Sequence, residues 1–275
     1  MKQIQLKVNA DKVIDLTIID NWGELNFNQV LYIANYWQAW QLLLKNNQSM
    51  QYARAKLFTI LIVNKSTNQL KEIITLLSQV DFEELDINLL SYTDFVFQKI
   101  ELTKNIMPVI KIGWFKKLYG PADRLTNISI NEFSFALNYY NLYNKFEKEE
   151  HLDLLFACLY RIPKKNWEAS GDIRSDFNTY TADKYLPEIK NINYAYKQVV
   201  YLYFHSCIEL FSKLFPYVFS KAEAGTSNSK QTFLDVILKI SGGKFGSYNE
   251  TSAQNAIIIL RDLNALLAEA SKNKK

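Results

Sequence analysis

The stretch NYAYKQVVYLYFHSCIELFSKLF, residues 193–215, decides the fold class. Its apolar side chains fall on nearly every face of a helix instead of on one stripe. A helix that is apolar all round lies in the interior of a larger structure. The stretch therefore predicts a long central helix that other helices cover.

The rest of the chain supplies those helices, because apolar residues recur three and four positions apart along most of it. The N-terminus departs from this pattern. Residues 3–8 and 13–19 are rich in Ile, Leu and Val, alternate in part, and are separated by an Asn9-Ala10-Asp11 break that is typical of a hairpin turn. We predict a mainly α protein, a multi-helix bundle with a short N-terminal β-hairpin. The predicted helices lie near residues 27–37, 50–63, 69–80, 87–101, 130–146, 149–160, 192–215, 230–240 and 250–270.

Four of these helices begin with the same local chemistry, a capping residue followed three positions later by Glu or Gln. The side chain of the cap accepts a hydrogen bond from a free backbone N–H of the first turn, and the later side chain accepts one from the N–H of the cap. The four pairs are Asn26 with Gln29, Ser66 with Gln69, Ser129 with Glu132, and Ser247 with Glu250.

The densest glycine cluster lies in ISGGKFGSYNETSAQN, residues 240–255. A phosphate-binding loop of the Walker type requires GxxxxGK followed by Ser or Thr, and this sequence does not supply that spacing. Gly242 and Gly243 follow a stretch with helical spacing, which is typical of a helix C-terminus, and Ser247 is typical of the next N-cap. We predict helix, turn, helix here, and no bound nucleotide.

At 275 residues, of which 48% are hydrophobic, the chain is long enough for one large core or two smaller ones. The best candidate for a boundary is LYGPADRLTN, residues 118–127, because Gly120-Pro121 breaks any helix there. This divides the chain into an N-terminal domain of hairpin and helices, residues 1–120, and a C-terminal helical domain, residues 121–275. One continuous domain is the alternative.

The net charge of +4 is the difference between 32 basic and 28 acidic residues, so no strong overall field attracts nucleic acid or anionic lipid. The segment from Leu25 to Leu44 carries no charge and has the length of a membrane span, but its scattered Asn and Gln residues favour a partly buried helix of a soluble protein. Cys158 and Cys207 lie in apolar runs, and the N-terminus does not resemble a signal peptide, so we predict reduced, buried thiols.

The two histidines are the main candidates for chemistry, and structural roles suit both. His205 and Glu209 lie four residues apart on one helix face, as a base and its orienting carboxylate would, but the surrounding helix is the buried one. His151 lies in the acidic stretch EKEEHLDLL, which is typical of a solvated helix start. We predict a non-enzymatic protein with no catalytic residue, no metal and no cofactor.

Two segments, residues 111–124 and 159–174, mix basic and aromatic residues. Basic side chains neutralise phosphates and aromatic rings stack on bases, so these segments define an alternative role in nucleic-acid binding. Both segments also contain proline and acidic residues, which fits ordinary surface loops. The candidate contacts are Lys111, Trp114, Lys116, Lys117, Lys164, Lys165 and Trp167.

Four fragments together carry a resemblance: NWGELNFNQVLYI from residue 21, LYGPADRLTNISINEFSFALNYY from 118, LDLLFACLYRIPKK from 152 and GDIRSDFNTYTA from 171. Their order resembles a group of uncharacterised proteins carried by phages and prophages of Bacteroidota, and the resemblance covers most of the chain. The group has no assigned activity, so it implies no catalytic residues. The matching residues are Trp22, Glu24, Leu25, Glu132, Phe133, Leu159, Tyr160, Arg161, Pro163, Asp172, Arg174, Phe177 and Asn178.

The resemblance implies a role among phage structural and assembly genes, as a tail component or a tail-assembly factor. Its partners would be other virion or assembly proteins, with self-association an option, and its location the virion or the bacterial host cytoplasm. Within this reading we predict that Asp172 and Arg174 pin the long loop after Arg161 by charge-assisted hydrogen bonds, with Phe177 as its apolar anchor. Salt-sensitive nucleic-acid binding is the competing hypothesis.

Overall fold

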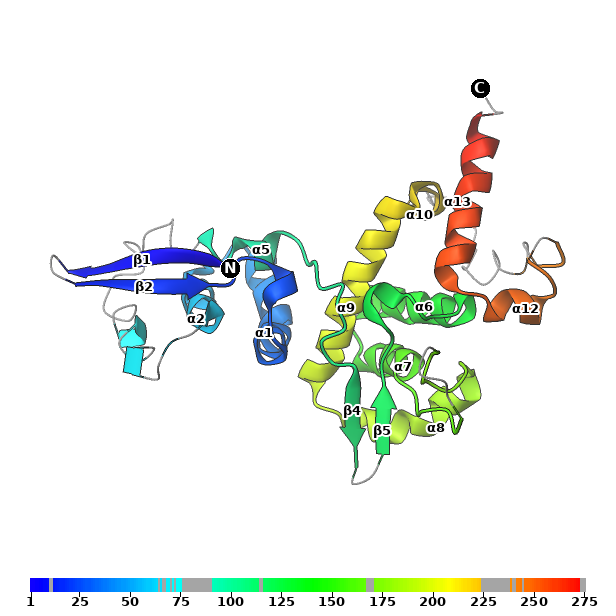
Figure 1. Cartoon of the computed structure of the whole chain (residues 1–275), viewed down its shortest axis with the longest axis horizontal. Coiled ribbons are helices and arrows are strands. Elements are labelled where there is room, and N and C mark those ends of the chain that lie inside the picture. The colour runs from blue at the N-terminus through cyan, green and yellow to red at the C-terminus, as the bar shows by residue number, and fades with distance from the viewer. Residues whose placement is uncertain are drawn as a thin grey trace. The chain divides into compact units, whose positions relative to one another are not determined.

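The computed structural model describes residues 1–9, 12–63, 65, 68–69, 71, 73–75, 91–113, 116–166, 171–223, 238, 241–243 and 245–272 (Figure 1). The described part is mainly helical, with small antiparallel sheets that include an N-terminal β-hairpin, which confirms the predicted class. The chain forms two compact units, Met1–Leu102 and Thr103–Lys275.

The first unit combines a three-stranded antiparallel sheet, in the order β1-β2-β3, with helices. The hairpin follows the alternation of its sequence, because Ile14, Leu16 and Ile18 of the second strand are buried, while Val13 and Asp15, at the alternate positions, are exposed. The elements of this unit are β1 (Lys2–Asn9), β2 (Lys12–Ile18), α1 (Phe27–Lys45), α2 (Gln51–Leu61), β3 (Ile62–Val63) and α5 (Asp94–Gln98).

Side-chain hydrogen bonds tie the start of α1 to the rest of this unit. Asn26 and Gln29 form the predicted reciprocal cap, and the amide of Gln29 also donates to the carbonyl of Ile60, 2.9 Å away. The buried indole of Trp22 donates to the carbonyls of Phe95 and Lys99 at 3.1 and 2.8 Å. These bonds fix the approach of the chain to α1.

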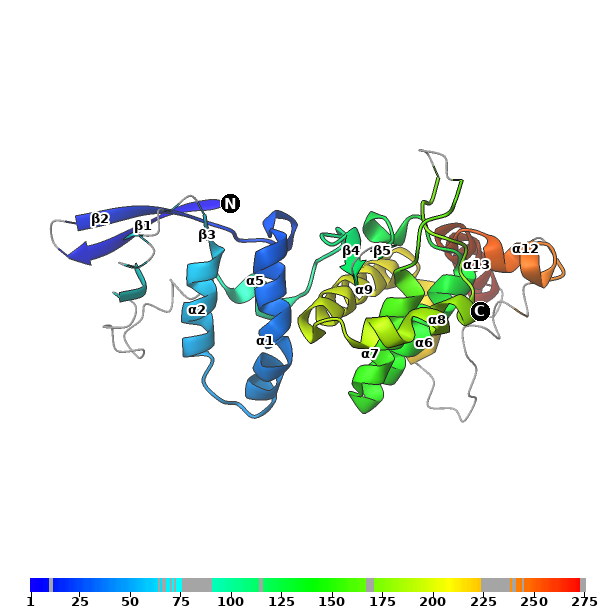
Figure 2. The same cartoon turned by 90° about the horizontal axis from the view of Figure 1, so that it is seen from below.

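The second unit is built around α9, the predicted central helix, most of whose side chains are buried. Helix α7 packs against α6, α8 and α9, and α10 packs against both α9 and α13 (Figures 1 and 2). The elements of this unit are β4 (Val109–Ile112), β5 (Lys116–Tyr119), α6 (Ile130–Phe146), α7 (Glu149–Leu159), α8 (Thr179–Lys190), α9 (Tyr194–Leu214), α10 (Pro216–Glu223), α12 (Tyr248–Ala253) and α13 (Ala256–Lys272).

The two segments predicted as surface loops contain strand pairing that the sequence did not reveal. Strands β4 and β5 pair as an antiparallel hairpin, and Tyr119 of β5 exchanges backbone hydrogen bonds with Arg161 at 2.8 and 3.0 Å. Pro163 in turn bridges Arg174. Four short segments therefore lie side by side in antiparallel order: 109–112, 116–119, 161–163 and 173–175.

The unit boundary falls between Leu102 and Thr103, and the segment 118–127 that the sequence favoured lies inside the second unit. Gly120 directly follows β5 and is packed tightly instead of exposed in a linker. Its N–H donates to the carbonyl of Pro108 at 2.9 Å, and a Cβ at this position would lie 2.6 Å from Cζ of Tyr160. Gly120 is therefore packed against buried side chains, and a larger residue would force them to shift.

Replacing Gly120 with alanine is expected to destabilise the second unit by about 1–3 kcal/mol, the usual range for overpacking a filled site. The added methyl would collide with Tyr160 and with the amide of Asn105, which lies 2.7 Å from the Cβ position. Chemical denaturation of the full chain measures the effect. Gly23→Ala is the matched control, because its Cβ meets nothing closer than 3.3 Å; equal denaturation midpoints for the two variants would refute the packing argument.

The glycine cluster forms a turn, as predicted. Gly242 and Gly246 adopt positive φ angles of 85° and 82°, and Ser247 and Glu250 form the predicted reciprocal cap of α12. The single helix predicted over 250–270 is wrong, because α12 ends at Ala253 and α13 begins at Ala256. Asn255 between them bridges Ser129 and donates to the carbonyl of Thr126 at 2.7 Å.

Some predictions lie outside the described residues, in whole or in large part. These are the helices near 69–80 and 230–240 and the cap at Ser66. The helix near 87–101 is described only from residue 91, and α5 there spans Asp94–Gln98. Helices α8 and α10 were not predicted.

Candidate functional site

The residues singled out by the sequence converge on one buried cluster of charges in the second unit. Glu132, from the first turn of α6, lies between the guanidinium groups of Arg161 and Arg174. Asp172 flanks Arg174. The side chains of Glu132 and Arg174 are fully shielded from solvent, and Arg161 is nearly so. Two positive and two negative side chains give the cluster no net charge.

Arg174 makes the most contacts in this cluster. Its guanidinium donates to Oε1 of Glu132 at 2.6 Å and to both carboxylate oxygens of Asp172 at 2.9–3.2 Å. It also donates to the carbonyls of Leu159 and Asn127, at 2.9 and 3.2 Å. The donors of the planar guanidinium are thus matched by carboxylates and backbone oxygens, the arrangement that makes a buried arginine tolerable.

Arg161 holds the other side of Glu132. Its guanidinium donates to Oε2 of Glu132 at 3.1 Å, to the carbonyl of Cys158 at 2.9 Å and to the carbonyl of Ser175 at 2.7 Å. The ring of Phe177 lies 5.8 Å from the guanidinium carbon. Arg161 therefore ties the end of α7 to the segment that leads into α8.

Together these bonds join the segment after Arg161 to α6 and α7, through residues that the sequence singled out. Asp172 also accepts from the backbone N–H of Arg174 at 3.0 Å, which fixes the local turn. Phe177 is half-buried and packs against Phe135 of α6, with ring centroids 5.5 Å apart. Asn178 then caps α8, because its side chain accepts from the N–H of Tyr180. A role of this segment in binding a partner stays a prediction.

Glu132 is the member of the cluster whose role the sequence missed. The predicted cap at Ser129 is half present, since the hydroxyl of Ser129 accepts from the N–H of Glu132 at 3.1 Å. The carboxylate of Glu132 does not return to Ser129 but turns inward to the two arginines. Two signals in the sequence pointed to it: the Glu132-Phe133 pair belongs to the resembling motifs, and Ile130 and Phe133 beside it are apolar. In the structure both of these neighbours are fully buried.

The carboxylates of the cluster favour the charged form of Arg174. Burial by itself lowers the pKa of Arg174, but Glu132 and Asp172 outweigh it and raise that pKa above its usual value. Burial, reinforced by Glu132, raises the pKa of the Cys158 thiol, whose sulfur lies 3.4 Å from the carbonyl of Glu132. A shielded thiol of this kind is a poor nucleophile. The arrangement therefore holds the start of α6, the end of α7 and the segment 172–175 together.

The two basic segments lie next to each other, because Tyr119 and Arg161 join them. Lys111 and Lys117 are directly opposite each other across β4 and β5, and both are exposed. Lys116 pairs with Glu188 at 2.6 Å and Lys164 with Asp176 at 2.8 Å. Lys165 is exposed, and Trp114 and Trp167 lie outside the described residues.

His205 is engaged by a tyrosine. Its Nδ1 lies 2.6 Å from the hydroxyl of Tyr140 on α6, and its ring also lies against Tyr201. Burial lowers the pKa of His205, and the charge of Glu209 offsets this only in part. The Tyr140 contact gives His205 a structural partner that joins α6 to α9.

Two acidic residues near His151, Glu149 and Asp153, pair with a lysine of α9 and not with the histidine. Lys197 of α9 is fully buried, with its ammonium 2.6 Å from Asp153 and 2.7 Å from Glu149. His151 itself lies 3.9 Å from Glu150 and against the ring of Phe146. Within the described ranges, no three His, Cys, Asp or Glu side chains are grouped in a way that could hold a metal ion.

Comparison with known proteins adds no relative: the chain matches no family model, no curated protein and no solved structure. Among the described residues, no helix has both the length and the apolar character needed to cross a membrane.

Proposed function

We propose that this protein is a non-enzymatic structural or assembly protein of a phage particle, a tail component or tail-assembly factor that acts through protein–protein contacts. One observation carries the proposal. Four of the five charged residues in the resembling motifs pair with one another and with backbone carbonyls: Glu132, Arg161, Asp172 and Arg174. Motifs of this kind specify a rigid scaffold more readily than a reaction centre.

Three further polar residues of the second unit support the same view. His205 contacts Tyr140, Lys197 holds Asp153 and Glu149, and the hydroxyl of Tyr203 donates to the carbonyl of Ala122 at 2.7 Å. Each of these contacts joins elements that are distant in the sequence. Because these side chains are engaged inside the unit, an assembly partner would be bound through the outer surface.

Deletion of the gene from its lysogen tests the proposal. After induction, we expect few or malformed particles by electron microscopy and a loss of infectious titre, both restored by the wild-type gene supplied in trans. Lys164→Ala, a change of one exposed ion pair, should restore them equally well. Normal particle number, shape and titre without the gene would refute a role in building the particle.

Nucleic-acid binding is the second candidate, and the placement of Lys111 opposite Lys117 favours it. Like charges directly across a strand pair destabilise the pair, and among the described residues neither lysine forms an ion pair with an acidic side chain. A phosphate backbone on this face would relieve that repulsion. Lys165 lies on the segment that is joined to β5 through Arg161 and Tyr119.

In this second case, the variant with both Lys111→Ala and Lys117→Ala is expected to bind DNA or RNA less tightly. Two lost phosphate contacts should reduce the slope of log affinity against log salt by about 2. Lys116→Ala is the matched control, because Lys116 is already paired with Glu188 and should change the slope less. Fluorescence anisotropy over a salt series measures it; no binding at low salt, or an unchanged slope, removes this candidate.

A further inference from the structure

We propose that the buried cluster of Lys197, Asp153 and Glu149 in the second unit forms an intramolecular amide bond between the side chains of Lys197 and Asp153. Glu149 is the proton relay of this reaction. The bond would join α9 to α7 covalently. It goes beyond the proposed assembly role and does not depend on it, and a reaction that occurs once within one chain is compatible with a non-enzymatic protein.

Three side chains from two helices meet at this cluster. Glu149 and Asp153 are one turn apart on α7, so they lie on one face of that helix, and α7 packs against α9. From α9, the nitrogen Nζ of Lys197 lies 2.7 Å from Oε1 of Glu149 and 2.6 Å from Oδ1 of Asp153. The side chain of Lys197 is fully shielded from solvent, and that of Asp153 is 7% exposed. An amine nitrogen and two carboxyl groups are thus held together away from water.

The two carboxylate contacts of the Lys197 nitrogen differ in direction. Nζ donates a hydrogen bond to Oε1 of Glu149 and another, at 3.2 Å, to the carbonyl of Lys190. Oδ1 of Asp153 is just as close, yet no described residue donates a hydrogen bond to it. The contact with Asp153 is therefore a close approach without the direction of a hydrogen bond. Groups that a fold holds at such short range react far faster than free ones.

The lysine sets this cluster apart from the Glu132 cluster of the same unit. There the cations are Arg161 and Arg174, and a guanidinium does not lose its proton in a protein. An ammonium group can pass a proton to a neighbouring carboxylate and then act as a nucleophile. In the other ion pairs of the described residues, the lysine side chains are 36–65% exposed. Among these pairs, Lys197 alone combines a reactive type of nitrogen with full burial.

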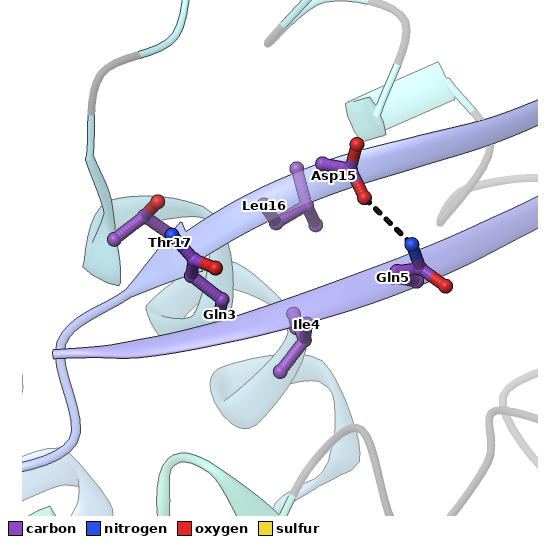
Figure 3. Close-up of a pocket in the computed structure, with 6 residues that line it drawn as sticks. All are labelled: Gln3, Ile4, Gln5, Asp15, Leu16 and Thr17. Carbon is purple, nitrogen blue, oxygen red and sulfur yellow. Dashed lines mark hydrogen bonds between the residues drawn. The ribbon is translucent and has the colours of Figure 1, made fainter.

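Shielding also distinguishes Asp153 from an exposed carboxylate such as Asp15. In the shallow depression on the N-terminal hairpin, the amide of Gln5 donates to Asp15 at 2.9 Å, and both side chains are exposed (Figure 3). Water stabilises the charge of a carboxylate in that position. Burial withdraws this stabilisation from Lys197 and Asp153, and a neutral amide would remove both buried charges. Condensation is therefore favoured at the buried pair.

The reaction is a condensation and needs no further reactant. A proton passes from Lys197 through Glu149 to Asp153, which leaves a neutral amine beside a neutral carboxylic acid. The nitrogen then attacks Cγ of Asp153, and Glu149 carries a second proton from the nitrogen to the leaving hydroxyl. A C–N bond replaces a C–O bond, one water is released, and nothing is oxidised or reduced. The side chain of Glu149 is 52% exposed, so the released water can leave to solvent beside it.

Mass spectrometry of the intact, full-length protein tests for the bond. The wild-type chain is expected to be lighter than its sequence by one water molecule. Lys197→Arg is the matched control, because arginine keeps the positive charge but cannot form this amide, and this variant should have its full sequence mass. A wild-type chain with its full sequence mass overturns the proposal, and so does an equal loss of water from Lys197→Arg.

Tryptic peptides locate the bond, because trypsin does not cleave after a lysine whose side chain is an amide. The digest of the wild-type chain should contain peptide 149–161 joined to peptide 191–213. Glu149→Gln retains Lys197 and Asp153 but removes the proton relay, so most of this variant should keep its water and be cleaved after Lys197. A simple ion pair would leave the mass of every variant at its sequence value. Cleavage of the wild-type chain after Lys197 overturns the bond, and complete linkage in Glu149→Gln overturns the relay.

Discussion

Replacing Arg174 with alanine is expected to lower the free energy of unfolding by about 3–5 kcal/mol, the range found when one partner of a buried ion pair is removed. The change would leave Glu132 fully buried with one arginine instead of two, and would unpair the carbonyls of Leu159 and Asn127. Arg174→Lys should recover only part of the loss, because an ammonium group cannot reproduce the planar donor pattern.

Urea denaturation of the full chain, followed by circular dichroism, measures this effect, and hydrogen exchange locates it. Exchange should accelerate in α6, α7 and the segment 161–178, and not in the first unit. Lys164→Ala is the matched control on the same segment, since its partner Asp176 is almost fully exposed and such pairs contribute little. If Arg174→Ala and Asp172→Ala were both as stable as Lys164→Ala, the cluster would not pin the segment.

The variant Lys197→Met is expected to cost about 3 kcal/mol, because it leaves the buried carboxylate of Asp153 without its cation. Methionine keeps most of the length of the side chain, so the loss reports mainly the charge. Adding Asp153→Leu to Lys197→Met should restore most of the stability, since a buried ion pair is often replaceable by apolar residues.

The four chains of this double-mutant cycle are compared by the same denaturation. The coupling between positions 153 and 197 is expected to exceed about 1 kcal/mol, as for residues in direct contact. Additive effects of the two changes would mean that Asp153 and Lys197 do not depend on each other.

The sequence predicted those features that depend on local chemistry. The all-round apolar pattern of residues 193–215 predicted that α9 lies in the core. The reciprocal caps at Asn26 and Ser247 are present as predicted. Each of these depends on residues within a few positions of one another. The hairpin at the N-terminus followed from alternation in the same way.

Features that depend on distant segments were not predictable. Glu132 looked like a capping residue, because its true partners lie 29 and 42 residues away. Strands β4 and β5 have four residues each and are rich in lysine, so their sequence resembles a loop. The break between α12 and α13 depends on the bridge from Asn255 to Ser129.

The sequence therefore predicted only part of the candidate cluster. Asp172 and Arg174 are two positions apart, so their contact follows from the local sequence, and Phe177 is a natural anchor beside them. The convergence of this pair with Glu132 and Arg161 required the packing of α6 against α7. No pattern within one segment contains that information.

Mass spectrometry of phage particles, purified after induction of the bacterium from which the gene comes, tests the proposed role in the phage particle most directly. The account predicts peptides of this chain at a fixed copy number per virion if it is a tail component. For a tail-assembly factor, it predicts the chain in tail precursors isolated from the induced cell. Absence from both particles and precursors, in cells that contain the protein abundantly, would contradict the account.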